Sequence, residues 1–246
     1  MSIECQADLD GMMLAGQVVA ETLRAMEKAT EAGIATRDLD EIGAAVLKGH
    51  GARSAPQYIY GCPTATLISI NDEIVHGLPG SRMLRAGDVV KLDVTAEVDG
   101  YIADAATTVI LGRASETAVN LKACAVSAFE AGVAVARAGR RVSAIGDAIE
   151  REVSSRGFHV LRQLSGHGIG RMIHEEPAVP NYFDPFQRDM LTEGLVLTIE
   201  PLISERRTGI VEDADGWTLR TRNGCLAAHY EHTMIITKGA PVIVTA

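Results

Sequence analysis

Residues 89–109 read VVKLDVTAEVDGYIADAATTV and give the clearest structural signal in the chain. Apolar and β-branched residues flank Asp99-Gly100, a dipeptide typical of a two-residue β-hairpin turn. If these two residues form the turn, Asp93 pairs with Ala106, and Asp104 lies two residues along the same strand and on the same face. The segment therefore predicts a hairpin on which Asp93 and Asp104 are diagonal cross-strand neighbours.

Two carboxylates this close together, on a mostly apolar pair of strands, repel each other and lose hydration. A bound cation would relieve both penalties, because it neutralises the charge and takes the place of the lost water. The alternative is that Asp93 and Asp104 are surface residues on an edge hairpin. The hairpin by itself leaves both interpretations open.

Three later segments add donor groups of the same kind. Glycines surround His167 in residues 164–177, LSGHGIGRMIHEEP, and let backbone and imidazole approach a ligand closely. Glu200 ends an apolar run, and Glu231 begins another. Each residue alone also has a structural explanation, either as a turn histidine or as the solvated end of a strand. Together with the two aspartates they make one imidazole and four carboxylates, a donor set that suits divalent Mn, Fe, Co or Zn and that can hold two ions.

Helical and strand patterns alternate along one continuous chain. A first helical run ends at Gly33, and Thr36 can cap a second helix that runs to about Lys48. Residues 65–70 and 88–111 change to β-branched runs broken by turn signals. The apolar residues of the first run recur at helical spacing and are Met12, Val19, Leu23 and Met26. These patterns predict an α/β fold.

A weak internal repeat appears at an offset of about 106 residues. The matched pairs are Gly33 and Gly139, Leu39 and Ile145, Leu47 and Val153, and Gly51 and Gly157. At an offset one residue longer, GDVVKLD at 87–93 aligns with GLVLTIE at 194–200, and each segment ends in a carboxylate. Chance is the alternative for so few positions. If the repeat is real, it predicts two pseudo-symmetric halves that each contribute a carboxylate from the same place.

Composition excludes several classes of protein. The chain has 246 residues and a formal charge of −9, which argues against binding to a nucleic-acid backbone. No run of about 18 apolar residues predicts a membrane span, and the N-terminus does not resemble a signal peptide. The four cysteines lie far apart, so neither a disulfide framework nor a zinc knuckle is indicated. We expect a single cytoplasmic domain over residues 1–246.

From about Leu9 to Val244 the chain resembles the type I methionine aminopeptidases of peptidase family M24. The resemblance implies the pita-bread fold, in which two α/β halves, here about residues 8–112 and 115–240, flank a dinuclear metal site. It also implies the short, bacterial-type form without a zinc-binding N-terminal extension. The motifs that carry it are Asn71-Asp-Glu-Ile-Val-His76-Gly, the Asp93/Asp104 pair, Gly166-His167-Gly-Ile-Gly170, His174-Glu-Glu-Pro177, Ile199-Glu200-Pro201 and Tyr230-Glu231-His-Thr.

The resemblance assigns roles to individual residues. It implies that two divalent ions, of Co, Mn, Fe or Zn, are bound by Asp93, Asp104, His167, Glu200 and Glu231. Asp104 and Glu231 match the carboxylates that bridge both ions, and His76 and His174 match two histidines near the substrate. We hypothesise that Glu200 is the general base. For His76 and His174 the alternative is a packed histidine that orients a carboxylate.

The substrate pocket is where the chain departs from the family. An ungapped alignment puts Ile59 and Cys62 where aromatic residues are usual, Leu67 where a cysteine is common and Ile173 in place of a usual phenylalanine. Trp217, the only tryptophan, is retained. The expected pocket is therefore apolar, with fewer aromatic walls to contact a methionine side chain.

The activity implied by the resemblance is hydrolytic removal of N-terminal methionine from nascent peptides whose second residue is small. The expected partners are such peptides and the ribosome, with no nucleic acid and no membrane, and the expected state is a monomer. One alternative is an Xaa-Pro aminopeptidase or dipeptidase of the same fold, against which the lack of their additional N-terminal domain argues. A second is a catalytically silent binding module, against which the complete donor set argues. A third, an acidic scaffold, rests on charge alone.

Overall fold

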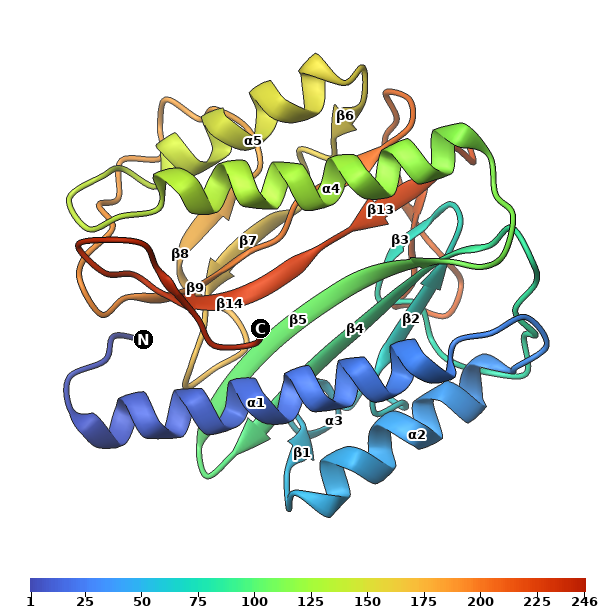
Figure 1. Ribbon diagram of the computed structural model, residues 1–246, viewed down its shortest axis with the longest axis horizontal. Helices are drawn as coiled ribbons and strands as arrows, with labels where there is room; N and C mark the ends of the chain where they lie inside the picture. Colours follow the sequence, from blue (N-terminus) through green and yellow to red (C-terminus); the bar gives the residue numbers. More distant parts are fainter.

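A computed structural model describes residues 1–246, and its centre is a nine-stranded sheet (Figure 1). The strands of this sheet are β1 (Arg53–Ser54), β2 (Leu67–Ile70), β4 (Val89–Val98), β5 (Tyr101–Ile110), β7 (Ser165–Gly168), β8 (Glu175–Pro180), β9 (Val196–Ile199), β14 (Glu231–Ile235) and β15 (Val242–Ile243). Their order is β1-β4-β5-β14-β9-β7-β8, with β2 beside β4 and β15 beside β14. Strands from the two halves of the chain therefore meet at the β5–β14 pair.

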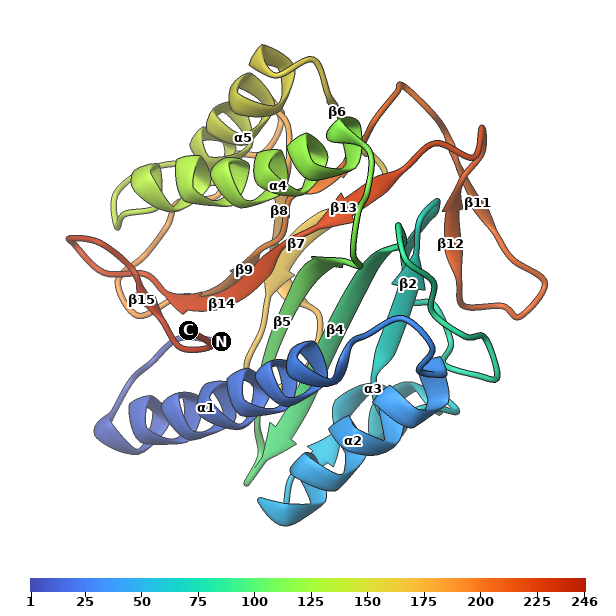
Figure 2. The same ribbon diagram turned by 45° about the vertical axis from the view of Figure 1, so that its right-hand side comes forward.

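Two small sheets complete the β structure. One contains β6 (His159–Val160), β10 (Leu202–Ser204) and β13 (Ala227–His229), in the order β13-β10-β6. The other contains β3 (Glu73–Val75), β11 (Ile210–Glu212) and β12 (Leu219–Thr221), in the order β11-β12-β3. In Figure 2 the strands β11 and β12 stand out beyond one end of the main sheet.

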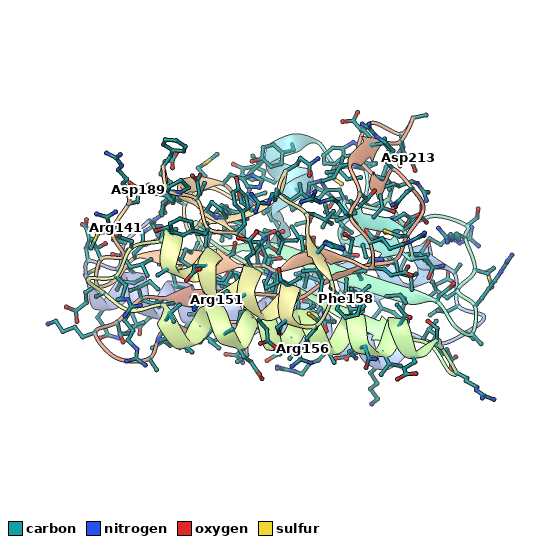
Figure 3. All side chains as sticks on the ribbon, turned by 90° about the horizontal axis from the view of Figure 1, so that it is seen from above. Arg141, Arg151, Arg156, Phe158, Asp189 and Asp213 are labelled. Carbon is teal, nitrogen blue, oxygen red and sulfur yellow. The ribbon has the colours of Figure 1, made fainter.

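Two pairs of helices cover one face of the main sheet. The helices α1 (Gln6–Ala29) and α2 (Thr36–Gly49) pack together over β4 and β5, and α4 (Glu116–Val135) and α5 (Ser143–Ser155) pack together over the other half (Figure 1). The short helix α3 (Ala55–Tyr60) lies beside β1 and β4. Seen from above, Arg151 of α5 lies on the helix side of the molecule, and Asp213, which follows β11, lies on the opposite side (Figure 3).

The predicted hairpin is confirmed in its register. Asp93 pairs with Ala106, and Thr95 pairs with Asp104. Asp99 and Gly100 both have positive φ angles, 50° and 85°, as a type I′ turn requires. Alternate residues of β4 belong to the core under α1, namely Val90, Leu92, Val94, Ala96 and Val98. Asp93 therefore points to the face of the sheet away from the helices.

The glycines of the sequence repeat have the same backbone role in each half. Gly33 and Gly139 have φ angles of 97° and 86°, and the N–H of each donates a 2.8 Å hydrogen bond, to the carbonyl of Leu84 and of Leu191 respectively. Each half also has its own hydrophobic core, of 26 residues under α1 and α2 and of 19 residues under α4 and α5. The repeat in the sequence thus corresponds to a repeat in backbone geometry.

Two details of the first helices differ from expectation. The helix α1 ends at Ala29, four residues before Gly33, and Gly33 instead turns the chain toward α2. Thr36 is the first residue of α2 and does not cap it, because Ala35 occupies the N-cap. The Thr36 hydroxyl instead exchanges hydrogen bonds with the backbone of Gly80, which ties the start of the helix to a distant loop.

By length and composition, α4 is apolar enough to cross a membrane, with a mean hydropathy of 1.4. It passes that test although polar residues such as Asn120 and Lys122 interrupt its apolar run. Leu121, Cys124 and Phe129 are buried in the core that α4 shares with α5 and the sheet. In this structure α4 is therefore packed as a core helix.

Candidate metal centre and active site

Five neighbouring strands each bring one polar side chain to the sheet face opposite the helices. In sheet order these are Asp93 on β4, Asp104 on β5, Glu231 at the start of β14, Glu200 directly after β9, and His167 on β7. The ligand atoms of Asp104, His167 and Glu231 lie within 4.8 Å of one another. The structure thus brings together all five residues that the sequence singled out.

Burial makes the charged forms of these side chains costly. Asp104 is 6% exposed and Glu231 is 2% exposed. Burial raises the pKa of the Asp93, Asp104, Glu200 and Glu231 carboxyls well above their ordinary values, and charge repulsion from neighbouring carboxylates raises these pKa values further. Burial also lowers the pKa of His167 to about 4, so its imidazole is neutral at pH 7. A neutral imidazole is the form that binds metals.

Unpaired atoms at the cluster fit a bound cation. Asp104 Oδ1 and Glu231 Oε1 are buried and have no hydrogen-bond partner. Leaving such an atom unpaired costs about 1–3 kcal/mol, which a coordinated ion would offset. Two groups of ligand atoms share Glu231, one with Asp104 and His167 and the other with Asp93 and His229. The donor set therefore fits two divalent ions with Glu231 between them.

Hydrogen bonds fix the orientation of His167 and Glu200. Thr198 Oγ1 donates to Glu200 Oε1 at 3.0 Å and accepts from the backbone N–H of His167 at 3.1 Å. His167 Nδ1 lies 3.0 Å from the Gly168 carbonyl, which assigns the ring proton to Nδ1 and leaves the Nε2 lone pair free. His167 Nε2 lies 3.4 Å from Glu200 Oε1. Such second-sphere contacts are typical of metal-binding histidines.

The glycines around His167 serve backbone packing. A Cβ atom on Gly166 would lie 2.6 Å from the Thr198 carbonyl oxygen, and one on Gly168 would lie 2.2 Å from the Glu176 carbonyl oxygen. These glycines therefore allow β7 to approach β9 and β8 closely. That they also let His167 approach a ligand closely stays a prediction.

A cavity of ≈ 140 Å³ opens beside the cluster. Three of the predicted pocket residues, Leu67, Ile173 and Trp217, line it. The other apolar or aromatic lining residues are Pro56, Tyr60, Val75, Leu164 and Leu202. The cavity thus combines an apolar wall with a polar, carboxylate-rich floor.

The expectation that Ile59 and Cys62 line the cavity was wrong. Ile59 packs against the core under α1, and Cys62 is buried with its Sγ 3.5 Å from Thr64 Oγ1. The cause is the helix α3, in which Pro56 and Tyr60 are four residues apart and therefore share the face toward the cavity. Tyr60 supplies an aromatic wall that the ungapped alignment does not reveal.

The two predicted non-ligand histidines also line the cavity. His174 Nδ1 lies 2.9 Å from Tyr60 Oη, and the His174 ring centroid lies 4.4 Å from that of His167. His76 follows β3 with a φ of 60°, an uncommon angle for a residue other than glycine. Burial lowers the pKa of His76 to about 4 and also lowers the pKa of His174. Both rings are therefore neutral at pH 7.

Sequence reasoning missed three residues of the site, namely Tyr60, Thr198 and His229. The signal for Thr198 was present, because Thr198 and Glu200 have a spacing of two, which directs both side chains to one face of a strand. His229 and Glu231 have the same spacing but lie on different strands, β13 and β14, so their spacing carried no such signal. The signal for Tyr60 required the boundaries of α3, which the sequence did not predict.

Known proteins resemble this chain over its whole length. The model of metallopeptidase family M24 matches residues 10–238. Methionine aminopeptidase 2 of Bacillus subtilis is 43% identical over 100% of this chain and 99% of its own length. The chain belongs to the methionine aminopeptidases of family M24. The crystal structure of a methionine aminopeptidase from Thermotoga maritima superposes with a TM-score of 0.96 and 35% identity, covering 100% of this chain and 99% of the other.

The pita-bread fold predicted for this methionine aminopeptidase is confirmed. A prolidase from Pyrococcus furiosus shares the fold, with a TM-score of 0.78 and 20% identity over 99% of this chain and 65% of its own. At that identity the likeness concerns the fold alone. The similar sequences are methionine aminopeptidases of a metallopeptidase family, so this chain is a metal-dependent hydrolase. The Xaa-Pro alternative is not favoured.

Metal binding should stabilise this methionine aminopeptidase measurably. An ion present at about 100 times its Kd adds about 2.7 kcal/mol to the free energy of unfolding, which corresponds to a Tm increase of about 5–10 °C for a chain of this size. Differential scanning calorimetry of the chelator-treated protein, with and without added Mn²⁺ or Co²⁺, measures this shift. Calcium is the matched control ion, and an unchanged Tm with Mn²⁺ and Co²⁺ would contradict metal binding at the cluster.

Metal binding should also release protons. Because burial and mutual repulsion raise the pKa of the four carboxyls, the metal-free protein holds protons on them to a higher pH than ordinary carboxyls do, and a divalent ion displaces these protons. His167, whose pKa is about 4, has no proton to release from Nε2 near pH 7. Metal affinity should therefore rise as the pH rises from 6 to 8. Isothermal titration calorimetry in buffers of different ionisation enthalpy counts the released protons, and a count of zero would contradict this electrostatic description.

Proposed function

We propose that this chain removes N-terminal methionine from nascent peptides whose second residue is small. In this proposal it works in the cytoplasm as a monomer, near the ribosome. It is one catalytic domain, residues 1–246, built from halves at about 8–112 and 115–240. The observation that carries the proposal is that five adjacent strands bring four carboxylates and an imidazole to the floor of one apolar cavity.

The metal-binding role falls to the five strand-borne residues Asp93, Asp104, His167, Glu200 and Glu231. We assign Asp104 and Glu231 to both ions, because each has a buried oxygen without a hydrogen-bond partner. When bound, two divalent ions supply a water of lowered pKa and polarise the carbonyl of the scissile peptide bond.

Glu200 is the proposed general base. Thr198 holds one of its oxygens, Oε1, which leaves Oε2 available to accept a proton from the attacking water. The raised pKa of its buried carboxyl matches this task, because a base must also hand the proton on, here to the leaving amine.

His174 is the proposed donor to the carbonyl oxygen. If Tyr60 Oη–H donates to His174 Nδ1, the ring proton is on Nε2 and can be donated to the oxygen as negative charge develops on it. His76, which also lines the cavity, is placed in this proposal against the nitrogen of the scissile bond or the residue that follows it.

The apolar wall is the proposed binding site for the methionine side chain. Full burial of this side chain contributes about 1.5–3 kcal/mol. Tyr60 and Trp217 are aromatic, and each can add a sulfur–aromatic contact worth roughly 0.3–1.5 kcal/mol. We assign the requirement for a small second residue in the peptide to crowding by the loops around the metal-binding residues.

A turnover screen tests the proposed activity. The purified chain is supplied in turn with Co²⁺, Mn²⁺, Fe²⁺ and Zn²⁺ and assayed on Met-Ala-Ser, Leu-Ala-Ser, Met-Lys-Ser and Gly-Pro peptides. We expect release of methionine from Met-Ala-Ser, and much slower turnover of the other peptides. Preferential cleavage of the Gly-Pro peptide would favour the prolidase-like alternative, and turnover of none of them would favour the silent binding module.

Replacing Ile173 with Phe should sharpen the choice of methionine. Ile173 is 3% exposed and lines the cavity, so an aromatic ring there adds one more contact to the thioether. We expect the ratio of kcat/KM for Met-Ala-Ser over Leu-Ala-Ser to rise by up to about tenfold, which corresponds to 1.4 kcal/mol. Ile59→Phe is the matched control, because Ile59 does not line the cavity. An equal ratio in Ile173→Phe and the unmodified chain would place Ile173 outside the methionine site.

A further inference from the structure

The cluster contains a second imidazole that the five-residue donor set leaves out. His229 is the last residue of β13, is 2% exposed and lines the same cavity as the carboxylates. Its Nε2 lies 3.3 Å from Glu231 Oε2 and 3.9 Å from Glu200 Oε2. His229 thus lies against the carboxylates, in a different group of ligand atoms from His167.

No protein group satisfies the His229 ring. Both Nδ1 and Nε2 are buried and have no hydrogen-bond partner. Buried polar atoms in native proteins are nearly always paired, and an orphaned one costs about 1–3 kcal/mol. The backbone of His229 is held firmly, because its carbonyl accepts from Thr108 Oγ1 at 2.7 Å and its N–H donates to the same oxygen at 3.1 Å. The ring is therefore held in a fixed place with its hydrogen-bonding capacity unused.

The separations match those of atoms that share one metal ion. Metal–ligand bonds of 2.0–2.2 Å put two ligands of the same ion about 3.0–3.5 Å apart. His229 Nε2 and Glu231 Oε2 are 3.3 Å apart, as close as the 3.4 Å between His167 Nε2 and Glu200 Oε1. The ligand atoms of Asp93, His229 and Glu231 all lie within 4.8 Å of one another, as do those of Asp104, His167 and Glu231.

We propose that His229 is a sixth metal-binding residue, so that each of the two ions has one imidazole ligand. In this arrangement Asp93 and His229 bind one ion, His167 and Glu200 bind the other, and Asp104 and Glu231 contact both. This inference rests on the metal-dependent function proposed above and adds a ligand to it. It also concerns metal choice, because imidazole suits Co, Fe and Zn better than it suits Mn, whose usual ligands are oxygens.

X-ray absorption spectroscopy of the protein loaded with two equivalents of Co²⁺ tests the proposal directly, because it counts imidazole ligands per ion. We expect an average of about one imidazole per ion in the unmodified protein and about one half in His229→Gln and in His167→Gln. His76→Gln is the control, because His76 lines the cavity outside both ligand groups and its loss should leave the count unchanged. An average of about half an imidazole per ion in the unmodified protein would overturn the proposal. This measurement does not depend on whether any variant folds.

Metal affinity gives a second readout. Loss of an outer-sphere partner typically lowers metal affinity by about 10–100-fold, so loss of a direct ligand should lower it at least as much. In His229→Gln we expect calorimetry to show one Co²⁺ site weakened by at least about tenfold and the Co²⁺ to Mn²⁺ affinity ratio reduced. Equal weakening of Co²⁺ and Mn²⁺ would indicate that His229 only orients a carboxylate. If the unmodified protein releases methionine but has only about half an imidazole per ion, this inference is wrong and the proposed function stands.

Discussion

Replacing Glu200 with Gln should lower kcat for Met-Ala-Ser by at least about 10³-fold. General-base catalysis contributes about 10²–10⁴ in rate, and this substitution also removes a charge that helps to hold the ions. The amide is close to the carboxylate in size and can still accept from Thr198 Oγ1, so the fold and the cavity should persist. Steady-state kinetics at saturating metal, together with the metal content of the protein, measure the effect.

A matched substitution separates the local effect from a general loss of charge. Glu212 is exposed on β11 and lies outside the cavity, so Glu212→Gln should leave kcat unchanged. If Glu200→Gln keeps both its metal and most of its turnover, Glu200 is neither the base nor an essential ligand. If Glu200→Gln loses its metal but regains full turnover once metal is resupplied, Glu200 only helps to bind the ions.

Replacing His174 with Ala should lower kcat by about 10²–10³-fold, the usual cost of removing one donor to a developing oxyanion. KM and metal content should change little, because His174 is an exposed residue of the cavity lining and belongs to neither group of ligand atoms. Tyr60→Phe should have a smaller effect in the same direction, because it removes the hydroxyl that pairs with His174 Nδ1 and keeps the aromatic wall.

An exposed histidine provides the comparison for His174→Ala. His159 lies on β6 and outside the cavity, so His159→Ala should behave like the unmodified protein. If His174→Ala instead loses its metal and recovers full kcat at saturating metal, the role of His174 is to support the ligands and not to act on the substrate.

Local sequence rules predicted the part of the site that strand register controls. The Asp99-Gly100 turn sets the pairing of β4 with β5, and the pairing alone places Asp93 and Asp104 on one face. The repeated glycines were equally informative, because Gly33 and Gly139 both need a positive φ that other residues rarely adopt. In both cases a short-range constraint on the backbone decided a long-range arrangement.

Tertiary contacts decided what the sequence could not predict. Whether Ile59 or Tyr60 faces the cavity depends on where α3 begins, and that is set by the Ser54 cap and by packing on β1 and β4. The place of His229 depends on β13 joining β10 in a separate small sheet, a pairing between segments that are far apart in the sequence. No spacing rule contains that information.

Ions held by the carboxylate and imidazole cluster should drive release of N-terminal methionine. The most direct test is to strip the protein with a chelator, remove the chelator, and titrate Mn²⁺ or Co²⁺ back while following methionine release from Met-Ala-Ser. We predict no turnover without metal, and turnover that rises with added ion and reaches a plateau by about two equivalents. Turnover that survives exhaustive removal of metal would show that the cluster does not act through bound ions.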